Sequence, residues 1–113
     1  MEIITLPADA VTRFGSTGVE IGPLAVFAAA SGRTSVHVAR LAPGGGIGRH
    51  PATGWQTFAV VAGAGWAAGG DGVRHPVAPG VAALWAPGEA HESGTDTGMV
   101  AVLVESSVRP VDL

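Results

Sequence analysis

The stretch GGGIGRHPATGWQTFAVVAG, residues 44–63, places one histidine and one glutamine at the start of an apolar run. His50 is followed by the turn-forming tetrapeptide PATG, and Gln56 is followed by TFAVVA, which is typical of a buried β-strand. On a straight strand the two side chains would lie about 20 Å apart, at ~3.3 Å per residue. They can meet only if the chain reverses between them, as the turn residues indicate.

Alternation along this run predicts which side chains face the core. Gln56, Phe58 and Val60 share one face, and Trp55 and Thr57 share the other. An amide among apolar side chains costs free energy unless it is hydrogen bonded. Gln56 therefore needs a partner, which can be a metal, a ligand, a water molecule or the facing histidine.

The composition limits the class of protein. A chain of 113 residues without cysteine is long enough for one domain with one core, and it needs no disulfide. Its six arginines are scattered and its net charge is −3, so we expect no nucleic-acid partner. The N-terminal sequence MEIITLPADAVTRF has no basic region of a signal peptide, and no apolar run approaches the ~20 residues of a membrane span. The sequence predicts a soluble, cytoplasmic protein with no membrane partner.

Glycine and proline interrupt the chain about every 8–12 residues, which favours an all-β sandwich or barrel over the helices that alanine alone would suggest. The strands expected from the apolar runs are Glu2–Leu6, Val19–Ile21, Leu24–Ala29, Thr34–Leu41, Gln56–Ala62, Gly65–Ala68, Val73–Val77, Ala82–Trp85 and Met99–Glu105.

The connections carry their own signals. Asp71-Gly72 predicts a type I′ hairpin turn, and Gly63 stands where a positive φ is expected. Pro7–Val11 predicts a helical turn.

Two glycine–histidine patterns resemble the two sequence motifs of the cupin superfamily. The first, with the order Gly, His, His, Glu, Gly in a cupin, is matched by Gly44, His50, Ala52, Gln56 and Gly63. The second, with the order Gly, Pro, Gly, His, is matched by Gly80, Ala86, Gly88 and His91, with the proline displaced to Pro87. Sixteen residues separate Gly63 from Gly80, and the Asp71-Gly72 turn lies between them.

The resemblance implies an all-β, cupin-type antiparallel double-sheet β-barrel (a jelly roll) with a site at its open end. Residues 1–113 would form a single cupin domain, with N-terminal strands in residues 1–33 and the motif-bearing barrel core in residues 34–105.

A typical cupin binds a divalent metal through three histidines and a glutamate. Here Ala52 and Gln56 stand at two of those four positions. The resemblance implies a divalent metal such as Zn, Ni or Fe held by His50, Gln56 and His91, and no organic cofactor. The alternative is a buried histidine pair, or a histidine bonded to Gln56, without an ion. An amide is a poorer ligand than a carboxylate, which favours Lewis-acid chemistry over O₂ activation.

Other side chains near the motifs are candidates for the site. His50, His91 and Glu89 are candidate catalytic residues, and either Glu89 or Glu92 can be a general base or a solvated loop carboxylate. Gln56, Phe58 and Trp85 are candidate ligand-binding residues, although Phe58 is also typical of a core and Trp85 of packing. Either His37 or Arg40 points inward, because alternation puts them on opposite faces, and His75 is expected at the surface.

Three functions follow from the resemblance. The first is an enzyme that acts on a small organic molecule by a redox-neutral reaction of isomerase, lyase or cyclase type. The second is a non-catalytic cupin that binds or senses a small ligand without metal. The third is a dioxygenase. Cupins commonly dimerise by sheet extension, and the apolar segment EIITL would suit that contact, so we expect a homodimer.

Overall fold

The computed structural model describes residues 1–113 and is almost entirely β-structure. One short 3₁₀ helix, η1, spans Arg13–Gly15. The strands are β1 (Asp9–Ala10), β2 (Thr17–Ala29), β3 (Gly32–Pro51), β4 (Trp55–Gly63), β5 (Gly65–Ala68), β6 (Arg74–Val77), β7 (Ala82–Trp85), β8 (Ala90–Gly94) and β9 (Met99–Ser106). No helix of this structure has the length and apolar character of a membrane span.

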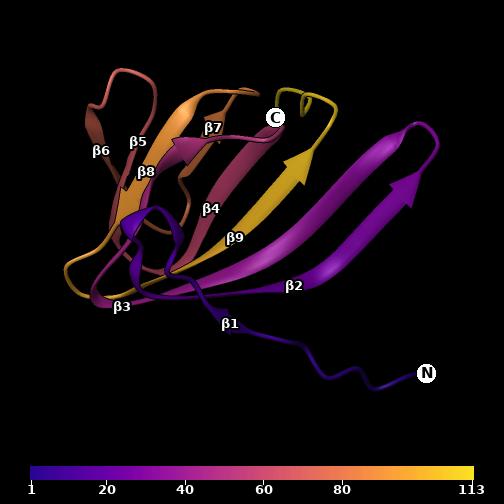
Figure 1. Cartoon of the computed structure of the whole chain (residues 1–113), viewed down its shortest axis with the longest axis horizontal. Helices are drawn as coiled ribbons and strands as arrows, with labels where there is room; N and C mark the ends of the chain where they lie inside the picture. Colours follow the sequence, from indigo (N-terminus) through magenta and orange to yellow (C-terminus); the bar gives the residue numbers. More distant parts are fainter.

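The strands form one continuous antiparallel path that folds over on itself. Its order is β6-β5-β8-β3-β9-β4-β7, and β2 pairs with β3 while β1 pairs with β2. Figure 1 shows the two layers that result, with the long β2–β3 hairpin projecting beyond the barrel. The architecture is the nearly closed antiparallel barrel that the sequence predicts.

The 20-residue strand β3 belongs to both layers. Its first half pairs with β9 from Thr34 to Leu41, and its second half pairs with β8 from Gly46 to Pro51. The bend between the halves includes Gly44, whose φ of 78° is easily adopted only by glycine. This bend brings the segment with His50 over the inner face of the other layer.

The core lies between the layers and follows the alternation of the strands. On β9 the inward residues Met99, Ala101 and Leu103 are buried. On β4 the buried residues are Gln56, Phe58 and Val60, and Trp55 and Thr57 are less buried, which confirms the predicted face. Phe58 is 1% exposed and is the largest fully buried side chain.

Most predicted strands are present. Gly65–Ala68 and Ala82–Trp85 have the predicted bounds, and the strands predicted at Gln56–Ala62 and Met99–Glu105 differ from β4 and β9 only at their ends. Val19–Ile21 and Leu24–Ala29 are not separate strands but parts of β2, which continues through Pro23 with an irregularity in its pairing to β3.

Two predicted segments are wrong, and one strand was not predicted. Glu2–Leu6 is not a strand, since it is exposed and pairs with nothing, and in Figure 1 it leads away from the barrel. Pro7–Val11 is not helical but contains β1, and the helical turn follows at η1. Strand β8 was not predicted, because its sequence, AHESG, is too polar to look like a strand.

The hairpin between β5 and β6 exists, but its turn is not type I′. That turn type needs a positive φ at two successive residues, whereas Gly72 has a φ of 72° and Asp71 does not have a positive φ. The Gly72 N–H instead donates to the Gly69 carbonyl at 3.0 Å, and Asp71 Oδ1 accepts from the Val73 N–H at 2.9 Å. Gly63 does have the predicted positive φ, at 74°.

Candidate functional site

A cavity of about 710 Å³ opens between the two layers, at the end where the motif residues meet. Its polar and aromatic lining includes His37, His50, Gln56, Trp85, His91 and Glu105. Five strands supply these six residues: β3 supplies two, one from each half, and β4, β7, β8 and β9 supply one each. The site is therefore a product of the fold and not of one local motif.

His50 and His91 lie next to each other across two strands. They are register partners in the pairing of β3 with β8, so both side chains project from the same face of the sheet. Their ring centroids are 4.4 Å apart. The structure thus brings the histidines of the two motifs together, as the sequence predicts.

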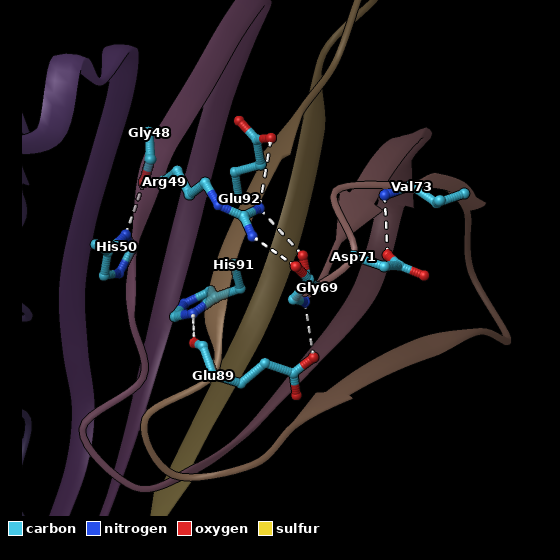
Figure 2. Close-up of polar contacts among 10 residues, drawn as sticks. Gly48, Arg49, His50, Gly69, Asp71, Val73, Glu89, His91 and Glu92 are labelled. Atoms are coloured by element: carbon cyan, nitrogen blue, oxygen red, sulfur yellow. Dashed lines mark hydrogen bonds and ion pairs between the residues drawn. The ribbon is translucent and has the colours of Figure 1, made fainter.

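Backbone carbonyl groups hold both imidazoles by the same ring nitrogen. The Nδ1 of His50 lies 2.7 Å from the Gly48 carbonyl oxygen, and the Nδ1 of His91 lies 3.1 Å from the Glu89 carbonyl oxygen (Figure 2). A carbonyl oxygen only accepts, so each Nδ1 donates and carries the proton of the neutral ring. Each Nε2 then has a free lone pair. The Nε2 of His91 is buried and has no hydrogen-bond partner.

The environment of His91 favours its neutral form. Burial lowers the pKa of His91 from its ordinary value of 6.5, and the neighbouring His50 lowers it further. The hydrogen bond to the Glu89 carbonyl group and the charges of Glu105 and Glu89 raise the pKa, but less than burial lowers it. His91 is therefore an unprotonated acceptor at neutral pH.

Aromatic rings enclose the histidine pair on both sides. Phe14 of η1 stacks on His50, with centroids 4.6 Å apart and planes inclined by 7°. Trp85 packs on the other side against His91, with centroids 4.3 Å apart. Phe58 follows at 5.8 Å from Trp85. The sequence indicates Trp85 as a candidate ligand-binding residue, but nothing in the sequence indicates Phe14.

Gln56 lies on the floor of the same cavity. It is 5% exposed, and its register partners are Trp85 on β7 and Glu105 on β9. It is the cavity's only primary amide side chain. Its position agrees with the prediction that the turn after His50 brings the amide back toward the histidines.

The two glutamates next to His91 do not line the cavity. Both carboxylate oxygens of Glu89 accept backbone N–H groups, Oε2 from Gly70 at 3.0 Å and Oε1 from Ala86 at 3.1 Å. This carboxylate therefore connects two loops. The structure does not bring it to the imidazoles, where a catalytic residue would have to lie. Figure 2 shows the Glu89 side chain leading away from His91, whereas its carbonyl group faces the ring.

Glu92 does not face the cavity, which decides against a general base at this position. It forms an ion pair of 3.9 Å with Arg49, which also donates to the Gly69 and Gly70 carbonyl oxygens. This exposed cluster joins β3, β8 and the β5–β6 loop.

The structure adds two polar residues to the predicted site. Glu105 lines the cavity and was not predicted, although alternation with Met99, Ala101 and Leu103 puts it on the inner face. His37 also lines the cavity, whereas Arg40 is exposed, which decides between the two residues that the sequence left open. His75 is exposed, as expected.

The donors of the site fit a divalent metal ion only in part. Two imidazoles with Nδ1 held by carbonyl groups and Nε2 directed away from them are typical of metal-binding histidines. The amide oxygen of Gln56 would be a third, neutral ligand. However, no group of three or more His, Cys, Asp or Glu side chains is arranged to hold a metal ion. The set fits a weakly bound ion better than a tightly bound one.

No family model matches the chain, and no curated protein matches it. Solved structures do match. The polyketide cyclase RemF from Streptomyces resistomycificus is 20% identical with a TM-score of 0.78, over 98% of this chain and 82% of RemF. A cupin-like protein from Thermotoga maritima is 21% identical with a TM-score of 0.79, over 96% of this chain and 83% of that one. An RmlC-like cupin from Shewanella frigidimarina is 16% identical with a TM-score of 0.72, over 93% of this chain and 86% of that one. This chain therefore has the fold of the cupin superfamily.

Proposed function

We propose that this protein binds a planar organic carbonyl compound in its cavity and catalyses a redox-neutral proton transfer on it, with His50 and His91 as acid and base. The observation that carries the proposal is the buried, unpartnered Nε2 of His91, on a ring that the Glu89 carbonyl group holds in one orientation. A buried acceptor without a partner costs free energy, and it is an unusual feature for a purely structural histidine.

The chemistry begins with a neutral imidazole. The Nε2 of His91 takes a proton from the carbon next to a carbonyl group. The electron pair of the C–H bond forms a C=C bond, and the π pair of the carbonyl group moves to its oxygen to give an enolate. Gln56 can donate its amide N–H to that oxygen, where negative charge develops. His50 is the second member of the acid–base pair.

Three reactions share this first step. The proton can return to a different carbon, which is an isomerisation, or a leaving group can depart, which is an elimination. The enolate carbon can also attack a second carbonyl group of the same molecule, whose oxygen then takes the proton, which is a cyclisation. No electron is gained or lost in any of them.

The rings around the histidines support a planar ligand. Phe14 packs against His50 and Trp85 against His91, and the cavity is within the size range of sites for small organic molecules. The similarity in fold to a polyketide cyclase is consistent with a cyclisation, although at 20% identity it supports the fold alone.

A divalent ion such as Zn²⁺, Ni²⁺ or Fe²⁺ would be an alternative to the metal-free acid–base pair, because it would occupy the same Nε2 lone pairs. His50, Gln56 and His91 would be its ligands, and it would supply Lewis-acid polarisation of a carbonyl oxygen. Metal content measured by plasma mass spectrometry on tag-free protein tests this. Near one ion per chain, lost in His91→Ala, supports the site, and no ion after incubation with all three metals contradicts it.

Ligand binding without turnover is the alternative function. It is favoured by the incomplete ligand set at Ala52 and Gln56, which a sensor or carrier would not need to keep intact. A stoichiometric complex from which the ligand is recovered unchanged would support it.

Exchange of hydrogen for deuterium tests the proton transfer without knowledge of the natural substrate. The probe is 2-tetralone, a bicyclic ketone, incubated in D₂O and followed by NMR at its C1 and C3 positions. We expect the protein to accelerate exchange above buffer, and His91→Gln and His50→Gln to lose most of that acceleration. His75→Gln is the matched control, since His75 is exposed and remote from the cavity. Equal rates in wild type and buffer would contradict the proposal.

We also propose a homodimer formed through the free edge of β2. Strand β1 pairs with Glu20 and Ile21, and the Val11 N–H donates to the Val19 carbonyl group, so the outer edge of β2 is free toward its C-terminal end, where Phe27 is 64% exposed. The unpaired N-terminal segment adds Ile3 and Ile4, which are also exposed. Sheet extension between two copies would cover both the free edge of β2 and the exposed N-terminal residues. A monomer in sedimentation at micromolar concentration would contradict the dimer.

A further inference from the structure

We propose that Glu105 is the specificity-determining residue of the cavity, and that its carboxylate accepts a hydrogen bond from a hydroxyl group on the planar ligand. The site would therefore select hydroxylated aromatic compounds and reject carboxylated ones. This inference rests on the proposed function, because it names the class of molecule that the same cavity would take.

Glu105 stands where the inner face of β9 changes from core to cavity. Met99, Ala101 and Leu103 precede it on that face and are buried, whereas Glu105 is only half-buried and lines the cavity. A fourth apolar residue would continue the core. A carboxylate at that position has a cost in desolvation that the fold does not require.

The neighbours of Glu105 place it in the same row as the proposed reacting groups. In the register of the sheet it lies between Ser35 of β3 and Gln56 of β4, and Gln56 is in turn the partner of Trp85. Its charge also raises the pKa of His91 against the effect of burial. One ligand can therefore reach Glu105 and His91 together.

No salt bridge engages this carboxylate, and Arg13, the arginine that lines the cavity, forms none. The one ion pair of the structure joins Arg49 and Glu92 on the outside of the barrel. Glu89 shows the contrast, because both of its carboxylate oxygens accept backbone N–H groups and it has a structural role. No hydrogen bond of that kind engages Glu105, which leaves its oxygens available to a ligand.

The chemistry of a carboxylate decides which ligands it accepts. A hydroxyl group donates to it in a short, charge-assisted hydrogen bond. A ligand carboxylate would meet a like charge in a cavity of low dielectric constant, which is unfavourable. A hydroxylated planar compound with a carbonyl group at the histidines satisfies Glu105 and the acid–base pair at once.

Two naphthalene probes of the same shape test the preference by isothermal titration calorimetry: 2,7-dihydroxynaphthalene and 2,7-naphthalenedicarboxylate. We expect the wild-type protein to bind the dihydroxy probe at least about tenfold more tightly, as expected for a hydrogen bond to a charged group. In Glu105→Gln this ratio should fall to within about threefold of one, since the charge is lost and the side chain keeps its size.

Glu20→Gln is the matched control. It makes the same change in net charge at an exposed position of β2, away from the cavity, and it should keep the wild-type ratio. Thermal unfolding of each variant checks that it is folded. The ratio in the wild-type protein is a test in itself if Glu105→Gln does not fold.

The outcomes separate this inference from the proposed function. Equal affinities for the two probes in wild type, an unchanged ratio in Glu105→Gln, or no binding of the dihydroxy probe would each overturn the role of Glu105. The deuterium exchange of 2-tetralone, which has no hydroxyl group, reports on the proposed function independently. Exchange with no probe preference therefore refutes only the inference, and preference without exchange refutes only the catalysis.

Discussion

His50 and His91 are antiparallel register partners on β3 and β8, and their ring centroids are 4.4 Å apart. Two imidazolium charges at that distance would repel each other in a partly buried site. Protonation of both rings at the same time is therefore unfavourable. The same geometry places the Nε2 atoms of the two rings, which are the candidate proton acceptors, beside each other. This relationship determines the stability and the chemistry expected of the site.

The stability of the metal-free protein should fall as the pH is lowered through the ordinary pKa of histidine. The pKa of His91 is lowered in the folded state, so below about pH 6.5 the unfolded state binds more protons and unfolding becomes easier. The contribution of His91 to the stability is fully present above the pKa that His91 has in the unfolded state. It is lost as the pH falls toward the lower pKa that His91 has in the folded state. Urea unfolding at about pH 7.5 and about pH 5.5 measures the difference.

His91→Gln should reduce this pH dependence, and the matched variant His75→Gln, at an exposed position, should keep it. A pH dependence that is the same in wild type and His91→Gln would show that His91 is not buried as a neutral ring.

Gln56→Glu should strengthen the binding of Zn²⁺ by at least about tenfold, because a unit charge in contact with the ion contributes roughly 1–4 kcal/mol in a partly exposed site. Glu105, its register partner, opposes part of this gain by like-charge repulsion. Calorimetric titration with Zn²⁺ measures the change. Gln56→Ala, which removes the third donor, should bind more weakly than wild type, and the reverse order would exclude residue 56 as a ligand.

Phe14 combines a stack on His50 with a strained backbone, at φ 59° and ψ 25°. Phe14→Ala loses the stack but keeps the strain, whereas Phe14→Gly loses the stack and relieves the strain. We expect the glycine variant to be more stable than the alanine variant by roughly 0.5–1 kcal/mol, because the left-handed strain of about 1–2 kcal/mol exceeds the larger backbone entropy that glycine loses on folding. Urea unfolding of both tests this, and a more stable alanine variant would mean that residue 14 is not held in the left-handed region.

Gly63 and Gly44 provide a test of why the first motif contains glycines. Both have positive φ, 74° and 78°, so alanine is equally strained at each. A methyl group at Gly63 would overlap the Gly98 carbonyl oxygen, whereas one at Gly44 would meet nothing within 4 Å. We expect Gly63→Ala to be less stable than Gly44→Ala by about 1–3 kcal/mol, the usual cost of overpacking. Similar free energies of unfolding would indicate that β4 and β9 can separate locally at Gly63.

Local signals in the sequence were sufficient for most of the fold. Burial alternates along β4 and β9, β5 and β7 are short apolar runs, and glycine or proline lies near the ends of all four. Strand β8 was missed because its residues serve the site and the outer ion pair more than the core. The segment Glu2–Leu6 was assigned to a strand on composition alone, and composition cannot show whether a pairing partner exists.

The sequence predicts those positions in the site that depend on the spacing of the motif residues. The convergence of His50, Gln56 and His91 follows from the motifs. The structural role of Glu89 could not be predicted, because it depends on two backbone N–H groups from separate loops. Glu105 could have been found from parity on β9, whereas the contact of Phe14 with His50 arises only from the path of η1 across β3.

The protonation of the two imidazoles tests the account most directly. A long-range proton–nitrogen NMR spectrum of the metal-free protein at about pH 7.5, with His50→Gln and His91→Gln for assignment, distinguishes protonated from unprotonated ring nitrogens. We expect both rings to be protonated at Nδ1 and the Nε2 of His91 to be unprotonated, and we expect addition of 2-tetralone to shift both Nε2 signals. Rings that are protonated at Nε2, or Nε2 signals that do not respond to the ketone, would contradict the assignment of His50 and His91 as the acid–base pair of this cavity.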